Sequence, residues 1–351
     1  MNSFGNKLRL TTFGESHGPA VGGIIDGFPS GFRVDFEHLA SEINARRPGA
    51  SKLVSQREED DIPEFLSGIT KDGITLGTPI GFIIRNKGHK NSDYDNIKDK
   101  FRPNHADYTY FKKYGIRASY GGGRASARET LNWVVAGALA QQWLKSQNIE
   151  VRALMTGAGS CDFSDIIKKS LIESPFSDNF HLDDSQKELL DSIILQAKNK
   201  GDSIGGKITG LVTGLKAGIG DPVFRKLQAN LAYAMLSINA VKSFEYGIGQ
   251  DALNYTGSES ADIFILDGKG LVSTATNFSG GIQGGISNGM PVFFSVTFKP
   301  SPSICQSLPT IDYEGNQTFI KVSGRHDSCV VLRAVPVVRA MTALVITDYL
   351  L

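Results

Sequence analysis

The chain has 351 residues, of which 40% are hydrophobic and 21% are charged, and its formal net charge is +1. These proportions are typical of a soluble globular protein. A near-neutral charge argues against a generic nucleic-acid-binding protein, which normally carries a basic excess. The three cysteines, Cys161, Cys305 and Cys329, are isolated in the sequence. That spacing argues against a disulfide framework and against a zinc site.

The sequence also argues against export and against a membrane span. Residues 1–10 contain no apolar segment of the kind that a signal peptide needs. The most apolar stretch, 330–351, is interrupted by Arg333, Arg339 and Asp348. We therefore expect a cytoplasmic protein with no membrane partner.

Patterns of hydrophobic residues predict a mixture of strands and helices along the chain. Strand patterns occur at 8–13, 21–25, 65–69, 74–78, 80–84, 207–215 and 293–298. Helical patterns occur at 35–45, 131–144, 185–200, 223–236 and 337–350. We expect 65–69 and 74–78 to pair with each other, and 86–117 to form a long functional loop.

Three details refine the helices. Asp35 is a suitable N-cap for the first helix. Residues 185–188 read as a capping box, Ser-Gln-Lys-Glu, at the start of an amphipathic surface helix. Residues 131–144 have almost no polar face, which indicates a helix buried inside a large protein.

A glycine-rich segment precedes that buried helix. Gly121, Gly122 and Gly123 run directly into Arg124, Ser126 and Arg128. Glycine lets the backbone approach a ligand closely, and a helix start offers unpaired N–H groups that favour anions. An anion site is one interpretation. A glycine loop before a core helix, with the arginines in structural ion pairs, is the other, and the residues alone leave both open.

Several further clusters point to acid–base chemistry on an anionic ligand. His17, His105 and His326 each lie in a segment punctuated by glycine or proline. Seven of the fifteen arginines lie in such segments as well: Arg46, Arg47, Arg57, Arg102, Arg124, Arg128 and Arg325. Arginine is suited to bidentate contact with carboxylate and phosphate. The glycine loop 277–289 fits neither a Rossmann nor a P-loop motif, and no metal-ligand spacing is present. Together these features predict a site for a small polyanion with general acid–base catalysis.

The sequence resembles the chorismate synthase family nearly from end to end. The segments that carry the resemblance, in order, are 14–18 (GESHG), 46–49 (RRPG), 102–107 (RPNHAD), 121–130 (GGGRASARET), 237–242 (SINAVK), 280–289 (GGIQGGISNG) and 324–327 (GRHD). Seven such motifs in the same order are a highly specific match.

The resemblance implies a lyase of the shikimate pathway, which serves aromatic amino acid biosynthesis. In the family, 5-enolpyruvylshikimate 3-phosphate loses phosphate and a ring proton by anti 1,4-elimination, which gives chorismate. Reduced FMN is required without net redox change, because the flavin lends an electron and takes it back. The implied fold is α+β, with helices sandwiched between two antiparallel β-sheets. The resemblance also implies a single domain over 1–351 and a flavoprotein that assembles as a homotetramer.

The resemblance also implies roles for individual residues. His17 matches the acid that protonates the departing phosphate, and His105 matches the histidine that manages flavin protonation. Asp327 matches the carboxylate that assists proton transfer at flavin N5. Ser16 and Ser126 match hydroxyls that support these transfers.

The implied binding residues form two groups. The flavin group consists of Arg124, Ala125, Ser126, Asn239, Ala240, Gly284, Lys299, Pro300, Ser301, Pro302, Ser303 and Arg325. The substrate or anion group consists of Arg46, Arg47, Lys52 and Arg128. No metal ligand is expected.

Four positions depart from the family pattern. Lys52 stands in place of an arginine, which replaces a bidentate contact with a point charge. Asn104 stands in place of a glycine before His105, and asparagine tolerates the left-handed conformation. Ala125 stands where the family has serine, and Ser328 where it has proline. None of these removes a catalytic group, so we expect activity, with possible effects on affinity and loop rigidity.

Two other functions remain as alternatives. A phosphomonoester hydrolase or phosphotransferase could use the same arginines, although it would lack a metal cluster or P-loop. A non-catalytic flavin carrier would bind FMN without releasing phosphate. For the reductant, we expect an external source of reduced flavin, with NADPH acting only indirectly.

Overall fold

The structure consists of two antiparallel sheets with helices between them. It is a computed structural model that describes residues 1–47, 61–86, 99–116, 121–268, 270–321 and 327–351. The first sheet has the strand order β1-β2-β3-β5-β4, with β1 (Ser3–Phe4), β2 (Arg9–Gly14), β3 (Ala20–Asp26), β4 (Glu64–Phe65) and β5 (Ile80–Arg85). The second has the order β7-β6-β8-β14-β9, with β6 (Glu150–Ala158), β7 (Cys161–Asp162), β8 (Gly206–Thr213), β9 (Val241–Tyr246) and β14 (Val292–Phe298).

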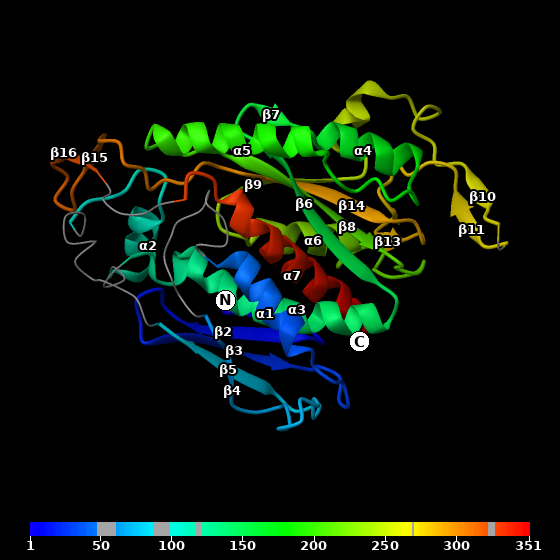
Figure 1. Ribbon diagram of the computed structural model, residues 1–351, viewed down its shortest axis with the longest axis horizontal. Helices are drawn as coiled ribbons and strands as arrows, with labels where there is room; N and C mark the ends of the chain where they lie inside the picture. Colours follow the sequence, from blue (N-terminus) through cyan, green and yellow to red (C-terminus); the bar gives the residue numbers. More distant parts are fainter. Residues whose placement is uncertain (48–60, 87–98, 117–120, 269, 322–326) are drawn as a thin grey trace.

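Three helices fill the space between the two sheets: α1 (Phe36–Arg46), α3 (Thr130–Ser146) and α7 (Val331–Leu350) (Figure 1). α4 (Ser164–Glu173) and α5 (Asp184–Asn199) cover the outer face of the second sheet (Figure 1). The remaining helices are α2 (Asp107–Tyr114) and α6 (Leu227–Leu236). The α+β fold with sandwiched helices, expected from the family resemblance, is confirmed.

Short 3₁₀ helices and hairpins complete the described part of the chain. The 3₁₀ helices are η2 (Gly123–Ala125), η3 (Ala127–Glu129) and η4 (Gly249–Asn254). The three hairpins are β10 (Phe264–Leu266) with β11 (Val272–Thr274), β12 (Ile282–Gln283) with β13 (Ile286–Ser287), and β15 (Leu308–Ile311) with β16 (Gln317–Ile320). η2 and η3 contain most of the glycine-rich segment and lead directly into α3. The segment is therefore attached to a helix at the centre of the fold.

The central helices are held unusually close together. A Cβ atom at Gly137 of α3 would lie 2.3 Å from Cα of Ala340 in α7. The backbones of α3 and α7 are therefore so close at this point that a side chain at position 137 would not fit. α3 is buried over most of its length, as its apolar sequence predicted. Its N-terminal end is consequently fixed by the core, and the glycine-rich segment is attached to a rigid support.

Some local predictions are confirmed. The Asp35 carboxylate accepts hydrogen bonds from the N–H groups of Glu37 and His38, so it caps α1 as expected. The strands expected at 8–13, 21–25, 80–84, 207–215 and 293–298 are β2, β3, β5, β8 and β14, with shifts of one or two residues at their ends.

The predicted pairing of 65–69 with 74–78 is confirmed only around its turn. Only Glu64–Phe65 forms a strand, and it pairs with β5. Thr75 bonds elsewhere: its N–H donates to Phe32 O at 2.9 Å, and its hydroxyl donates to Pro29 O at 2.6 Å. The two segments still meet at the turn: Leu76 N–H donates to Gly68 O at 2.9 Å, and Ile69 and Thr75 form an antiparallel bridge.

Several helix predictions also need correction. The expected loop 86–117 contains α2. The capping box of α5 consists of Asp183 and Gln186, two residues before the predicted Ser185, because the Asp183 carboxylate accepts the Gln186 N–H. α6 begins at Leu227 rather than near 223. α7 begins at Val331 rather than 337, because buried packing of this helix outweighs the hydrogen bond lost at Pro336.

Candidate active site

The glycine turn, residues 121–123, lies between two histidines. A Cβ atom at Gly121 would lie 2.5 Å from both Cε1 and Nδ1 of His17. A Cβ atom at Gly122 would lie 3.4 Å from Cε1 of His105. Because a side chain at Gly121 would collide with the imidazole, this position must be glycine for His17 to occupy its place. The turn therefore brings together two residues that the sequence separates by 88 positions (105 − 17).

His17 follows the end of β2 and is oriented by its neighbour. Its Nδ1 lies 3.0 Å from Oγ of Ser16, a side chain that is largely buried. Asn86 holds this turn from the other side, because its Nδ2 donates to the carbonyls of Glu15 and Gly18 at 3.2 and 2.6 Å. The expected pair of Ser16 and His17 is thus assembled as one unit.

His105 precedes α2 and faces a buried ion pair. Its Nδ1 lies 2.9 Å from Oδ1 of Asp107, although the ring N–H is not well aligned with that oxygen. Arg102 holds the same carboxylate through Nε and Nη2, both at 2.7 Å. Asn104 has a φ of 60°, the left-handed conformation expected for it. Lys299 donates from Nζ to the carbonyl of Asn104.

Burial and neighbouring charges determine the protonation states of His105 and Asp107. Burial lowers the pKa of His105, and the nearby Asp107 only partly offsets that effect. Burial alone would raise the pKa of Asp107, but the hydrogen bonds from Arg102 and the close approach of the His105 ring outweigh it and hold that pKa well below its usual range. Asp107 is therefore ionised and His105 is favoured in its neutral form near pH 7.

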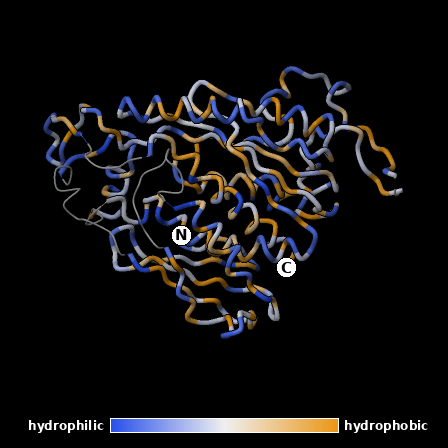
Figure 2. The backbone as a smooth tube through the Cα atoms, viewed as in Figure 1, coloured by the Kyte–Doolittle hydropathy of each residue, from blue (hydrophilic) through white to orange (hydrophobic). Residues whose placement is uncertain are grey.

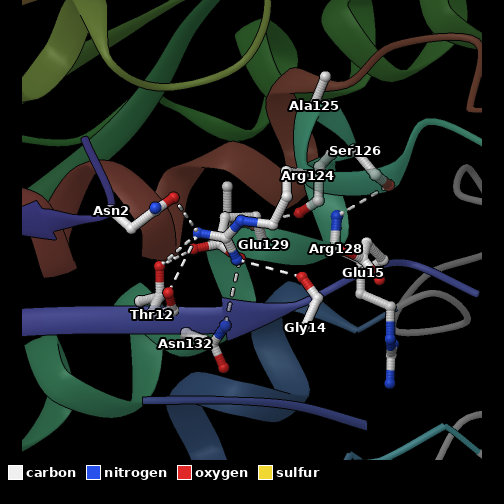
Figure 3. A network of polar contacts seen from close by, with 12 residues as sticks. Asn2, Thr12, Gly14, Glu15, Arg124, Ala125, Ser126, Arg128, Glu129 and Asn132 are labelled. Carbon is white, nitrogen blue, oxygen red and sulfur yellow. Dashed lines mark hydrogen bonds and ion pairs between the residues drawn. The ribbon is translucent and has the colours of Figure 1, made fainter. Parts of the chain in front are cut away.

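Arg124 is engaged by a network that ties the glycine turn to β2 (Figure 3). Its Nη1 donates to Glu129 Oε2 at 2.5 Å and to the Gly14 carbonyl at 3.2 Å. Its Nη2 donates to Oγ1 of Thr12 at 2.8 Å, and Thr12 in turn donates to Glu129. Burial raises the pKa of Glu129, although Thr12 and Arg124 oppose it. The sequence left open whether Arg124 binds an anionic ligand or forms a structural ion pair. The structure shows the ion pair, with Glu129.

Two expected anion-binding arginines share one buried carboxylate. Arg128 Nη2 lies 3.0 Å from Asp61 Oδ1, and Arg46 Nη1 lies 3.6 Å from Asp61 Oδ2. Arg46 also donates to the carbonyl of Ala127 at 2.9 Å, and Arg128 donates to Oδ1 of Asn86 at 2.5 Å. The Asp61 side chain is fully buried. Asp61 thus gathers two guanidinium groups beside the start of α3.

Asp327 joins the site through Arg333. Arg333 Nη1 lies 2.5 Å from Oδ2 of Asp327, and its Nε donates to the carbonyl of Arg46 at 3.0 Å. The first turn of α7 is thereby connected to the end of α1. Asp327 is thus linked by hydrogen bonds to the arginine pair around Asp61.

The residues expected to hold the flavin meet next to the glycine turn. Asn239 donates from Nδ2 to the Ala125 carbonyl at 2.9 Å, and Lys299 N–H donates to the Ala240 carbonyl at 2.9 Å. Ala240 has a φ of 70°, a conformation that costs energy for a non-glycine residue and is concentrated at functional sites. Oδ1 of Asn239 is buried and has no partner among the described residues. An N–H group of a bound ligand would satisfy it.

The other expected residues are less closely connected. Residues 300–303 extend from the same end of β14 as Lys299, and the Ser301 carbonyl accepts from Ser203 Oγ at 2.7 Å. Ser126 accepts the Arg128 N–H at 3.3 Å. Gly284 lies in the β12–β13 turn, beside the bridge between Ile286 and Gly220.

Three expected positions complete the account. Arg47 caps the C-terminal end of α1 through its backbone N–H. Lys52 and Arg325 lie outside the described residues. The departure at Ser328 places a buried serine whose carbonyl accepts the Ile204 N–H at 2.8 Å.

Sequence reasoning missed the acidic partners of the arginines, which are Asp61, Asp107 and Glu129. Asp61 stood in an acidic run, 58–61, that is typical of a solvated surface. Asp107 and Glu129 lie five residues after Arg102 and Arg124, respectively. This shared spacing of five residues was the only sequence feature that pointed to the two ion pairs, and it does not by itself predict that they are buried.

A cavity of about 540 Å³ adjoins the Arg124 network. Its lining includes Thr12, Tyr110, Arg124, Trp133 and Tyr233, and also Ala106 and Ala125 beside the glycine turn. This volume is in the range of small-molecule sites. Across the described residues, no cluster of three His, Cys, Asp or Glu side chains could hold a metal ion. Within the same residues, no helix combines the length and apolarity needed to cross a bilayer.

Comparison with known proteins identifies the family. The family model described as chorismate synthase matches residues 8–351. Chorismate synthases of Phocaeicola vulgatus and Parabacteroides distasonis are each 49% identical to this chain, over 100% of it and 98% of their own length. A crystal structure of chorismate synthase superimposes with a TM-score of 0.76 at 28% identity, over 99% of this chain and 92% of the other. The chain belongs to the chorismate synthase family. It is therefore an enzyme of the lyase class, as the sequence motifs predicted.

Gly121→Ala tests the steric role of the glycine turn. The added Cβ would displace the His17 ring, and a displacement of about 1 Å can cost roughly 100-fold in rate. We therefore expect turnover to fall by about 100-fold, measured by steady-state kinetics on folded protein.

Gly115→Ala is the matched control. Gly115 also has a positive φ, 72°, but a Cβ there meets nothing within 4 Å. Both variants place alanine in a left-handed backbone conformation, which destabilises both. They differ only in that the Gly121→Ala side chain collides with His17. Equal turnover in the two variants would contradict the steric argument.

Proposed function

We propose that the enzyme converts 5-enolpyruvylshikimate 3-phosphate to chorismate and phosphate by anti 1,4-elimination in the presence of reduced FMN. The single observation that carries the proposal is the arrangement of His17 and His105 on either side of the glycine turn, in a chain of the chorismate synthase family. We further propose a single domain over 1–351 that works in the cytoplasm.

Recognition of the substrate would use arginines that are ordered by the fold. The substrate carries two carboxylates and a phosphate. Arg46 and Arg128 both contact Asp61, and contacts to Ala127 and Asn86 fix their side chains. Arginines that are ordered before the ligand arrives lose little side-chain entropy on binding. This preorganisation supports a role in anion binding.

His17 is suited to act as the general acid toward the leaving phosphate. Its Nδ1 lies 3.0 Å from Ser16 Oγ, a contact that orients the imidazole beside the glycine turn. Transfer of a proton to phosphate lowers the charge on the leaving group, and a general acid contributes about 10²–10⁴-fold to rate. Neutral His105, on the other side of the turn, is suited to exchange a proton with a ring nitrogen of a bound flavin.

The residues present fit a flavin. Reduced FMN, when bound, supplies an electron that assists phosphate loss and is returned by the end of the reaction. Asn239, Ala240, Ala125 and Lys299 would hold the ring system, since Asn239 Oδ1 has no partner among the described residues and the adjacent Ala240 has a φ of 70°. Arg333 orients the Asp327 carboxylate for the proton transfer that the family resemblance implies.

The decisive experiment measures phosphate release from 5-enolpyruvylshikimate 3-phosphate under anaerobic conditions, with and without dithionite-reduced FMN. We expect release only with reduced flavin, together with the absorbance of the chorismate diene. His17→Ala should lower the rate by about 10²–10⁴-fold, because the general acid is removed. An arm with NADPH and oxidised FMN should show no NADPH consumption by the purified protein.

The other outcomes select the alternatives. Release of phosphate without flavin would indicate a phosphomonoester hydrolase. Binding of FMN with no release under either condition would indicate a flavin carrier. Consumption of NADPH by the protein alone would overturn the external source of reduced flavin.

We also propose a homotetramer, supported by an exposed apolar hairpin. The β10–β11 hairpin extends from the body of the molecule and is coloured mainly as hydrophobic (Figure 2). Phe264, Leu266 and Val272 are 64%, 69% and 67% exposed. Large apolar side chains gathered at one exposed site mark association surfaces.

Light scattering after gel filtration should give four times the chain mass. The Leu266→Asp/Val272→Asp double variant should reduce that mass, because charged groups on the hairpin disfavour burial. A wild-type protein that runs as a monomer at micromolar concentration would contradict this proposal.

A further inference from the structure

The Arg102–Asp107 ion pair beside the site is buried and held by several hydrogen bonds. Both side chains are 4% exposed, and the carboxylate receives two guanidinium donors at 2.7 Å and the Arg102 backbone N–H at 3.1 Å. Such an arrangement fixes a carboxylate in both position and charge. The remaining neighbour of Oδ1 is Nδ1 of His105, at 2.9 Å.

We infer that Asp107, held by Arg102, is a positioning residue for His105, which it orients with Nδ1 toward the carboxylate and Nε2 free for the ligand. The orientation follows from the ring. Nδ1 faces Asp107, and Cε1 faces the space above Gly122 that a side chain would fill. Nε2 is the nitrogen that remains. An ionised carboxylate next to Nδ1 favours the tautomer with its proton on that nitrogen.

Arg102 has a second contact that links the two halves of the site. Its Nη2 also donates to the carbonyl of Gly121 at 3.2 Å. Gly121 is the residue at which a Cβ atom would lie 2.5 Å from the His17 ring. One guanidinium therefore fixes both the carboxylate that orients His105 and the turn that separates the two histidines. The role of this pair in turnover rests on the proposed function, but its effect on His105 does not.

The charges around His105 determine in which direction each substitution should shift the pKa of this histidine. The charged groups that act on His105 are Asp107, Arg102 and Lys299. Burial lowers the pKa of His105, Asp107 raises it, and Arg102 and Lys299 lower it. Removal of the Asp107 charge should therefore lower this pKa further, whereas removal of the Arg102 charge should raise it. A variant that merely loosened the structure would move the pKa upward in both cases, toward the value of an exposed histidine.

The experiment uses NMR of full-length protein labelled with ¹³C and ¹⁵N at histidine. A His105→Gln spectrum assigns the His105 signals. Asp107→Asn and Arg102→Gln are compared with wild type, and the Arg102→Gln/Asp107→Asn double variant covers the case in which a single variant fails to fold. Glu42→Gln is the control, because Glu42 forms a similar bidentate pair with Arg339, at 2.8 and 3.2 Å, between α1 and α7.

We expect wild-type His105 to carry its proton on Nδ1 when neutral. Asp107→Asn should lower its pKa and Arg102→Gln should raise it, while Glu42→Gln should leave both tautomer and pKa unchanged. The double variant should lose the preference for the Nδ1–H tautomer. An unchanged tautomer in both Asp107→Asn and the double variant, or a pKa that rises in Asp107→Asn, would overturn the inference.

Steady-state kinetics separates this inference from the proposed function. Loss of a partner that orients a functional histidine typically costs about 10–100-fold, so we expect kcat of Asp107→Asn to fall by that factor. KM should change by less than about threefold, because Asp107 itself does not contact substrate. Asp107→Glu, which keeps the charge, should recover part of the loss. An altered His105 tautomer with wild-type kcat would uphold the positioning of His105 and contradict its part in the proposed reaction.

Discussion

The close contact between Gly121 and His17 is the constraint on which the site depends. No side chain fits between the turn and the imidazole, so the distance between β2 and the start of α3 is set by bare backbone. The turn keeps this position because α3 is buried and packs against α7 without room for a side chain at Gly137. Core packing and site geometry are therefore parts of one arrangement, in which the sandwiched helices hold the turn and the turn holds the histidines.

Buried carboxylates make this arrangement electrostatically possible. Arg102, Arg124 and the pair Arg46–Arg128 would be costly to bury alone, and Asp107, Glu129 and Asp61 compensate them in turn. Each ion pair also donates a hydrogen bond to a backbone carbonyl of a neighbouring segment, for example Gly14 or Gly121. The arginines are thereby fixed before a ligand binds, so that little reorganisation is needed in the reaction.

The sequence predicted local features well and long-range pairing poorly. The Asp35 cap, the buried α3 and the left-handed Asn104 follow from local rules of capping, periodicity and backbone conformation. The motifs predicted the family, and through it the fold. Sequence could not predict that Asp61 and Glu129 are buried partners of arginines, since ion pairing depends on which segments the fold brings together. The predicted hairpin of 65–69 and 74–78 is confirmed only around its turn for the same reason, because Thr75 also bonds to 29–32.

The central claim is that one ligand site lies between His17 and His105. It is tested most directly by following all histidine ¹³Cε1 signals while 5-enolpyruvylshikimate 3-phosphate and oxidised FMN are added, a combination that allows binding without turnover. We expect the His17 and His105 signals to shift together along one saturation curve, while those of His38 and His181 remain unchanged. Shifts at only one of the two site histidines, or at His38 and His181 instead, would contradict it.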